Sequence, residues 1–350
     1  TLKVSAPAAG GNAGVLSISN PNGNFDNAGT IQAKGGNGGS NGSFLLDTAA
    51  LPTFSSLAST LANASLTHSQ IIRVRSGDVI LDGNAVAREF RLSADQGSVT
   101  VTGTINASGT TGGSVHLSAN RNLTLQTGSR ITVAGQTFSN SGKGGEVTLE
   151  AGTQSNGVIG DGILDLQTGS TIDLSVASKI AGNANTTGTS AYKGQFSGTL
   201  HLRAPQVAAH NDLRINAIGS SIIDASSITV EGYRIYDLTS SGGAITTAVQ
   251  DQIKADATAY LGAGGSTTAN YSSILNRVLG GNTALDPLVV LAPGVEIINR
   301  NGDLTLGTSN TTTTSDWNLS TFRFGAKSAP GVLTLRASGN LVFNNSLSDG

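Results

Sequence analysis

The stretch that decides the fold is GSVTVTGTINASGTTGGSVHLSANRNLTLQTGSRITV, residues Gly97–Val133. It holds five short runs of the form apolar–polar–apolar, with Gly, Asn, Ser or Thr between most of them. The runs are Val99–Val101, Ile105–Ala107, Val115–Leu117, Leu123–Leu125 and Ile131–Val133. Alternation with period two places the first and third residue of each run on one face of a β-strand and the middle residue on the other. The stretch therefore predicts a series of short strands, which taken alone could also form a meander of hairpins.

The same phrase returns along the rest of the chain, and this repetition favours a solenoid. Segments that fit it are Gly14–Asp47, Asn122–Ala151, and Gly162–Ser178 followed by Gly198–Ala204. LTLQTGSRITV and LDLQTGSTIDL, which begin at Leu123 and Leu164, are nearly identical. Repeats of roughly 20 to 50 residues are typical of solenoids, and three short strands per repeat predict a parallel β-helix. An antiparallel sandwich or barrel is the alternative, but it does not need near-copies of one phrase.

Composition narrows the functional classes. The net charge is −2 without a Lys/Arg cluster, which gives no support to nucleic-acid binding. The absence of Cys excludes disulfides and thiolate metal sites. No signal peptide is visible, and no stretch approaches the ~20 apolar residues of a membrane-spanning helix. Because Met is also absent, we expect Thr1 not to be a native start and the chain to be an internal piece of a larger protein.

The chain is predicted to be all-β, with short helical and loop insertions in the solenoid. We expect a β-helix over 1–243 with insertions near 48–67 and 179–196, a helical hairpin over 244–280, and a continuation of the β-helix over 281–350. Within the first insertion, helical spacing of Leu57, Leu61 and Ala64 predicts a helix over Ser55–Ala64, capped by Ser55 or Ser56. The insertion at 179–196 and the segment 310–315 are predicted to be polar loops.

The hairpin is predicted to consist of helices Thr246–Leu261 and Tyr271–Leu279, joined by GAGGSTT. Its amphipathic character predicts packing on the flank of the solenoid, and binding of a partner is the alternative. In the strand region before it, Tyr233, Arg234 and Tyr236 are expected to cover an exposed corner. We take Tyr233, Tyr236, Tyr260 and Tyr271 as candidate partner-contact residues.

No catalytic, cofactor-binding or metal-binding residue is predicted. The four histidines, His68, His116, His201 and His210, form no H-x-x-x-H or H-x-H pair, and the Asp-containing calcium nonapeptide is absent. Asp78 and Asp82, which flank one run, are interpreted as corner caps.

Paired carboxylates would mark a polysaccharide hydrolase, and Asp161, Asp165 and Asp173 are the candidates. The near-copy has Thr124 and Thr132 where Asp165 and Asp173 stand, so we interpret these as ordinary surface residues. We find no cluster of three or more carboxylates or Arg/Lys on one face of adjacent coils.

A family resemblance is carried by LVVLAPGVEIINRNGDLTL, SDWNLSTFRFG and PGVLTLRASGNLVFNNSLSDG, between Leu288 and Gly350. These segments resemble filamentous-haemagglutinin-like exoproteins, large proteins of Gram-negative bacteria that are exported by two-partner secretion. GGSVHLSANRNLTLQTGS and GKGGEVTLEA look like the generic repeats of the same family. The resemblance implies a right-handed parallel β-helix, a location outside the cell or at its surface, and an outer-membrane transporter as partner. It carries over no catalytic residues, and the secretion domain is not found here.

These observations predict a structural shaft segment of a secreted surface fibre or adhesin. Its further partners would be a host or neighbouring cell surface, or other copies of itself in a filament. The alternatives are a β-helical polysaccharide-active enzyme and the stalk of a contact-dependent toxin-delivery protein.

Overall fold

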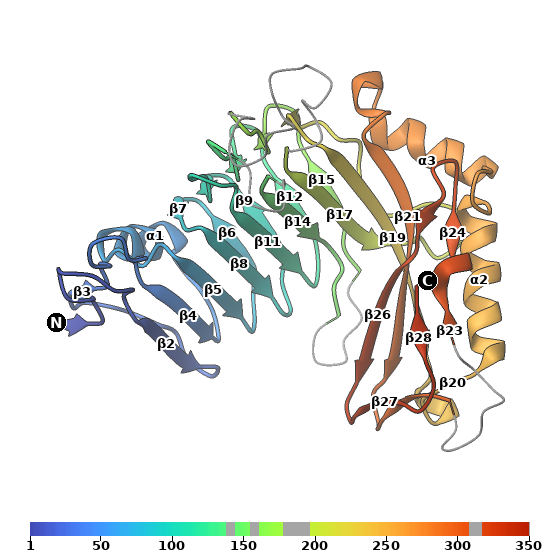
Figure 1. Cartoon of the computed structure of the whole chain (residues 1–350), viewed down its shortest axis with the longest axis horizontal. Helices are drawn as coiled ribbons and strands as arrows, with labels where there is room; N and C mark the ends of the chain where they lie inside the picture. The colour runs from blue at the N-terminus through green and yellow to red at the C-terminus, as the bar shows by residue number, and fades with distance from the viewer. Residues whose placement is uncertain (138–143, 155–160, 178–196, 308–316, 350) are drawn as a thin grey trace. The chain divides into compact units, whose positions relative to one another are not determined.

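The computed structural model describes residues 1–350 except 138–143, 155–160, 178–196, 308–316 and 350, and it is mostly β (Figure 1). The loops expected at 179–196 and 310–315 lie outside the described residues. The few helices are α1 Phe54–Asn63, α2 Thr247–Leu261 and α3 Ala269–Leu279, with short 3-10 turns at Thr239–Ser241, Thr283–Leu285 and Leu319–Thr321. The expectation of a mostly β chain with short helical insertions is therefore confirmed.

The largest sheet is parallel and has ten strands. In sheet order they are β2 Val15–Asn20, β4 Ser43–Thr48, β5 Ser69–Val74, β8 Glu89–Ala94, β11 Ser114–Ala119, β14 Glu146–Glu150, β17 Thr199–Pro205, β19 Ser227–Asp237, β21 Val289–Asn299 and β26 Val332–Ala337. Sheet order follows chain order, so each new strand is added at the same edge.

Two further parallel sheets use the strands between these. One contains β7 Asn84–Val86, β10 Thr104–Asn106, β13 Arg130–Thr132, β16 Thr171–Asp173 and β18 Ser221–Ile223; the other contains β6 Val79–Leu81, β9 Val99–Val101, β12 Leu123–Leu125 and β15 Leu164–Leu166. From β5 to β16, every third strand therefore joins the same sheet, a cycle compatible with a parallel β-helix.

Apolar residues stack in register along these sheets. Ile105 pairs with Ile131, and Ile131 with Ile172, and all three side chains are buried. The two near-copies also lie strand on strand, since Leu123 pairs with Leu164. Like side chains thus pack on like in a narrow core, which favours small branched residues of matching volume.

A glycine permits close approach where the connection between β8 and β9 lies against that between β5 and β6. A Cβ on Gly97 would lie 1.9 Å from the carbonyl oxygen of Gly77. No side chain fits at that distance, so the turn requires glycine here.

Helix α1 lies within the predicted insertion and begins one residue earlier than expected. Its buried residues include Phe54, Leu57 and Leu61. The N-cap is Thr53, whose side chain makes no capping hydrogen bond, so the prediction of Ser55 or Ser56 as the cap is wrong. Asp82 instead accepts hydrogen bonds from the Ser55 backbone N–H at 2.9 Å and from its hydroxyl at 3.1 Å.

The chain divides into two compact units, which are described separately. Unit 1 contains residues 1–202 and 215–228, and unit 2 contains 203–214 and 229–350. Unit 1 also includes the short parallel pair β1 Leu2–Lys3 and β3 Ile31–Gln32.

Unit 2 adds smaller sheets to the long strands β21 and β26. One of the smaller sheets is parallel and contains β20 Ala244–Ile245, β22 Leu304–Leu306 and β27 Leu341–Phe343. The other two are pairs: β23 Trp317–Asn318 with β28 Leu347–Ser348, and β24 Arg323–Phe324 with β25 Ala329–Pro330. The β24–β25 pair is antiparallel, a departure from the repeat expected over 281–350. Two β-like runs of the sequence, Leu288–Leu291 and Val295–Ile298, are separated by Pro293–Gly294 and are expected to form separate strands. They instead merge into the single strand β21.

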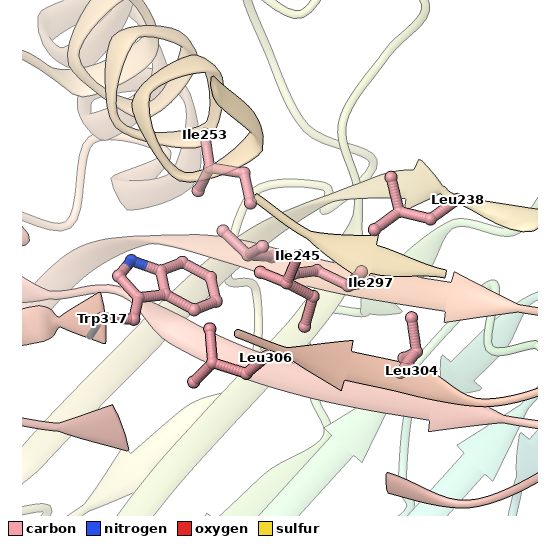
Figure 2. Close-up of a cluster of buried hydrophobic side chains, with 8 residues drawn as sticks. Leu238, Ile245, Ile253, Ile297, Leu304, Leu306 and Trp317 are labelled. Carbon is pink, nitrogen blue, oxygen red and sulfur yellow. The ribbon is translucent and has the colours of Figure 1, made fainter. Parts of the chain in front are cut away.

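Helix α2 packs its apolar side against the strands of unit 2. Ile253 points from the helix toward a buried cluster that includes Ile245, Ile297, Leu306 and Trp317 (Figure 2). The two predicted helices of the hairpin are confirmed, with α2 beginning one residue later and α3 two residues earlier than expected.

Candidate functional site

The candidate partner-contact tyrosines are mostly inside unit 2. Tyr233, Tyr260 and Tyr271 are 1%, 3% and 4% exposed, and Tyr236 is half-buried. The expectation that Tyr233 covers an exposed corner is therefore wrong, and three of the four candidates lack the exposure that a partner contact needs.

The surroundings of Tyr236, Tyr260 and Tyr271 disfavour ionisation of their hydroxyl groups. The Tyr236 hydroxyl donates a hydrogen bond to Asp256 at 2.9 Å. Burial, followed by this bond, raises the pKa of Tyr236 above its ordinary value. Burial likewise raises the pKa of Tyr260 and of Tyr271, so all three remain neutral at physiological pH.

Four charged side chains come together on successive strands, and we call them the charge ladder: Arg203 of β17, Glu231 of β19, Glu296 of β21 and Arg336 of β26. The Nε–H of Arg203 donates to Glu231 at 2.9 Å, and its Nη2 donates to Glu296 at 2.8 Å. Arg336 donates from Nε to the other oxygen of Glu296. Glu296 therefore bridges two guanidinium groups.

The centre of the charge ladder is shielded from water. The side chains of Arg203, Glu231 and Glu296 are 5%, 1% and 0% exposed, whereas that of Arg336 is 47% exposed. The Arg203 guanidinium carbon also lies 4.0 Å from the centroid of the Tyr233 ring, a cation–π contact. Buried charges of this kind are tolerated because each is paired and hydrogen-bonded.

This cluster corrects the expectation that adjacent coils carry no grouped charges. Sequence reasoning missed it because Arg203 is 28 residues from Glu231 and 93 residues from Glu296. The available signal was an ionisable residue inside an apolar strand, as in VEII around Glu296. Two carboxylates could in principle act as acid and base, but a substrate would have to reach groups that are no more than 1% exposed.

The carboxylates predicted as hydrolase candidates do not form such a pair. Asp165 and Asp173 lie in different sheets, on β15 and β16. Asp165 accepts a hydrogen bond from Asn216 at 2.9 Å, and Asp173 accepts one from Arg130 at 2.5 Å. Asp173 is 9% exposed, so the interpretation of Asp173 as an ordinary surface residue is wrong, because its ion pair holds it in the sheet.

The remaining polar candidates have local roles. Asp78 accepts the Ser98 backbone N–H at 2.8 Å, in agreement with its predicted capping role. Asp82 accepts the Ser55 N–H in the first turn of α1, so it binds a helix and not a corner of the repeat as expected. His116 is half-buried on β11, with Nε2 3.5 Å from Glu150. Within the described ranges, three or more His, Asp or Glu side chains nowhere gather as a metal site.

A cavity of about 220 Å³ lies in unit 2, and we call it the aromatic cavity. Its apolar wall comes from α2 and from the last strands, and includes Ile253, Ala257, Val295, Trp317, Phe322 and Leu333. The ring centroids of Trp317 and Phe322 are 5.9 Å apart at an interplanar angle of 76°, an edge-to-face arrangement typical of aromatic packing.

Three of the residues that line the aromatic cavity carry polar groups: Trp317, Arg323 and Asp349. The indole Nε1–H of Trp317 is buried and finds no hydrogen-bond partner among the described residues. Arg323 and Asp349 also line the cavity and form an ion pair of 2.8 Å. The sequence offered one signal for this site, since the only tryptophan of the chain stands beside two phenylalanines in DWNLSTFRF.

Comparisons with known proteins identify no relative: the chain matches no protein-family model, no curated protein and no solved structure. Of the helices that the structure describes, none has the length and apolar character required to cross a bilayer.

Proposed function

We propose that the chain is a right-handed parallel β-helix that serves as a shaft segment of a large secreted surface fibre or adhesin. The observation that carries this proposal is the three-strand cycle from β5 to β16, with successive strands parallel and in register. A meander or sandwich would pair consecutive strands with each other, whereas here consecutive strands belong to different sheets.

The same arrangement supports a mechanical role. Backbone hydrogen bonds join each strand to the next one in its sheet, and rows such as Ile105, Ile131 and Ile172 bury apolar area at each step. Such burial contributes roughly 25 cal/mol per Å². In an array of this kind most contacts are between neighbouring coils, so stability adds along the array, as a stiff shaft requires.

The cellular context of the proposal rests on the resemblance of the segment from Leu288 to Gly350 to filamentous-haemagglutinin-like exoproteins. It includes secretion through an outer-membrane two-partner-secretion transporter and a place at the cell surface or in an extracellular filament. A host or neighbouring cell surface, or further copies of the chain, would be the partners.

Electron microscopy of the native material tests the fold and the function together. We expect thin rods with a repeat of about 4.8 Å from stacked strands. Rods that radiate from cells would support an adhesin shaft, and continuous filaments of many copies would support a polymer subunit. Compact particles without that repeat would overturn the proposal.

A matched pair of variants tests the core rows directly by circular dichroism and thermal unfolding. Ile131→Asp places a charge in the buried row and should abolish the β signal or lower the midpoint strongly. Thr124→Asp changes an outward position on β12 and should leave the fold intact. Its paired residue on β15 is already an aspartate, Asp165. Equal effects of both variants would contradict the inward and outward assignment.

A polysaccharide-active enzyme is the second candidate, and the charge ladder is the observation that favours it. The burial of both glutamates argues against it. Loss of viscosity of an acidic polysaccharide, abolished by Glu296→Gln and retained by Glu150→Gln, would support the enzyme. No loss with the folded wild-type chain would leave the shaft as the better proposal.

A further inference from the structure

The connection between α3 and β21 contains an Asp–Pro bond, Asp286–Pro287, and no other Asp–Pro pair occurs in the sequence. The bond follows the 3-10 turn Thr283–Leu285, and both of its residues are exposed to solvent. Because proline has no backbone N–H, the nitrogen after Asp286 cannot close on the carboxyl group to give a cyclic imide. The remaining intramolecular reaction of the carboxylate is with the carbonyl carbon of this peptide bond.

The ammonium group of Lys327 contacts the carbonyl oxygen of the same bond. Its Nζ donates to the oxygen of Asp286 at 2.7 Å, to that of Pro287 at 3.0 Å and to that of Val289 at 2.7 Å. Lysine has three N–H donors, and all three meet backbone carbonyls here. Attack on the Asp286 carbonyl carbon places negative charge on its oxygen, and a cation already held at hydrogen-bonding distance stabilises that charge.

The carboxylate of Asp286 is available as the nucleophile. Among the described residues, none forms a hydrogen bond or an ion pair with it. Attack on its own carbonyl carbon closes a succinic anhydride ring, so the covalent structure of the residue keeps the two reacting atoms close together. Such an intramolecular attack avoids the entropy cost of bringing two molecules together, and carboxylates act as nucleophiles in covalent catalysis.

From these observations we propose that unit 2 cleaves its own chain between Asp286 and Pro287. A carboxylate oxygen of Asp286 forms a bond to the Asp286 carbonyl carbon, and the carbonyl π electrons move to the oxygen that Lys327 holds. When that electron pair returns, the C–N bond breaks, and the Pro287 nitrogen takes a proton from solvent and leaves as a secondary amine. One water molecule then opens the anhydride to two carboxyl groups on Asp286.

The two products would remain assembled after cleavage. The bond precedes β21, which lies between β19 and β26 in the ten-stranded sheet. Ile297 of β21 is also buried in one cluster with Ile253 of α2. Backbone hydrogen bonds and apolar contacts therefore hold residues 287–350 on the preceding part of unit 2. This inference goes beyond the proposed shaft function and does not depend on it, because it needs only the geometry of unit 2.

Intact-mass spectrometry of the purified full chain tests the proposal directly. At neutral pH we expect two fragments whose masses sum to that of the chain plus one water, the second of them beginning at Pro287. The folded chain should cleave at least about tenfold faster than the chain held unfolded in urea at the same pH, because only the fold places Lys327 at the carbonyl oxygen.

Variants separate the nucleophile from the cation. Asp286→Ala should abolish cleavage, and Asp286→Glu, which keeps the charge but requires a larger ring, should cleave far more slowly. Lys327→Met should slow cleavage about tenfold, because it removes the group that stabilises the oxyanion. Lys254→Met is the matched control in the same unit and should cleave at the wild-type rate, since its ammonium donates to the Thr321 hydroxyl and not to a backbone carbonyl.

An intact wild-type chain after several days at neutral pH would overturn the proposal, and so would fragments with any other boundary. Equal rates for the folded and the urea-unfolded chain would show that the fold does not promote cleavage. Equal rates for Lys327→Met and Lys254→Met would remove the role of the Lys327 ammonium. If Lys327→Met fails to fold, the comparison of the folded and the unfolded wild-type chain still decides the question.

Discussion

Among single residues, Arg203 holds the charge ladder together, because it donates to both buried glutamates. Arg203→Met would remove the hydrogen bonds that Arg203 donates to Glu231 and Glu296. Glu296 would keep its hydrogen bond from Arg336. Breaking a buried ion pair by removing one partner costs about 3–5 kcal/mol, so we expect a loss of that size in the free energy of unfolding, measured in urea at neutral pH.

Arg336→Met is the matched control for this prediction. Its side chain is 47% exposed, and Glu296 keeps Arg203 after the change. Exposed ion pairs contribute about 0–1 kcal/mol, so the loss should be clearly smaller. Equal losses in the free energy of unfolding for the two variants would show that the buried Arg203 contributes no more to stability than the exposed Arg336.

A second residue-scale prediction concerns alkaline pH. Burial raises the pKa of Tyr236, Tyr260 and Tyr271 above the ordinary value of about 10. On raising the pH, the unfolded chain therefore releases these protons at a lower pH than the folded chain does. The contribution of the three tyrosines to the free energy of unfolding is complete below about pH 10 and falls as the pH rises above it. Tyrosinate absorbance should show these three of the five tyrosines ionising only when the β signal in circular dichroism is lost.

The chain unfolded in denaturant provides the reference, with all five tyrosines ionising near pH 10. Ionisation of all five at that pH while the fold is intact would contradict the buried positions of these side chains.

Residue exposure could be predicted only where strand alternation decides it. The inward rows and the outward Thr124 follow from period two, and the structure agrees. Tyr233 and the charge ladder could not be predicted in this way, because a polar residue on the second face of a strand is exposed only if nothing covers that face. Which side chains cover it depends on contacts over as many as 93 residues of sequence.

Among the elements, the three helices differ in whether the N-cap side chain makes a hydrogen bond: those of α2 and α3 do, and that of α1 does not. The hydroxyl oxygens of Thr246 and Thr268 accept the backbone N–H groups of Val249 and Tyr271, at 3.3 and 3.1 Å. Replacing such a cap by Ala costs about 1 kcal/mol. We therefore expect Thr246→Ala and Thr268→Ala each to lower the free energy of unfolding by about that amount.

Thr53→Ala is the control for the capping prediction, because Thr53 stands at the N-cap of α1 without a side-chain capping bond. It should change stability by less than the two capping variants in the same urea titration. Asp82→Ala, which removes the acceptor for the Ser55 N–H, should instead destabilise α1. A larger effect of Thr53→Ala than of Asp82→Ala would contradict this assignment.

The elements differ in how far local signals determine them. Helices α2 and α3 were predicted to within two residues because apolar spacing defines them and a glycine-containing link separates them. Their threonine caps were not predicted. The long strand β21 was predicted as two runs, because Pro293–Gly294 normally interrupts a strand. The antiparallel pair β24–β25 was also missed, since pairing partners are not encoded in the period of a single strand.

For the whole molecule, the exposed apolar residues of β27 indicate that the 350-residue chain associates in solution. Leu341 and Phe343 of β27 pair in register with Leu304 and Leu306 of β22, which are buried. They continue the same apolar rows, yet they are 47% and 49% exposed. In the ten-stranded sheet, β2 and β26 are the edge strands, and uncovered edges promote pairing with another chain.

We therefore expect concentration-dependent association of this chain in sedimentation velocity. The double variant Leu341→Lys with Phe343→Lys should shift the distribution toward monomer, because a charge on the exposed row opposes stacking of a second copy. Ile71→Lys, at a 37% exposed position on the internal strand β5, should leave association unchanged. Since association through the exposed rows requires those rows to be apolar, a monodisperse wild-type monomer at all concentrations, or equal effects of the two variants, would contradict this prediction.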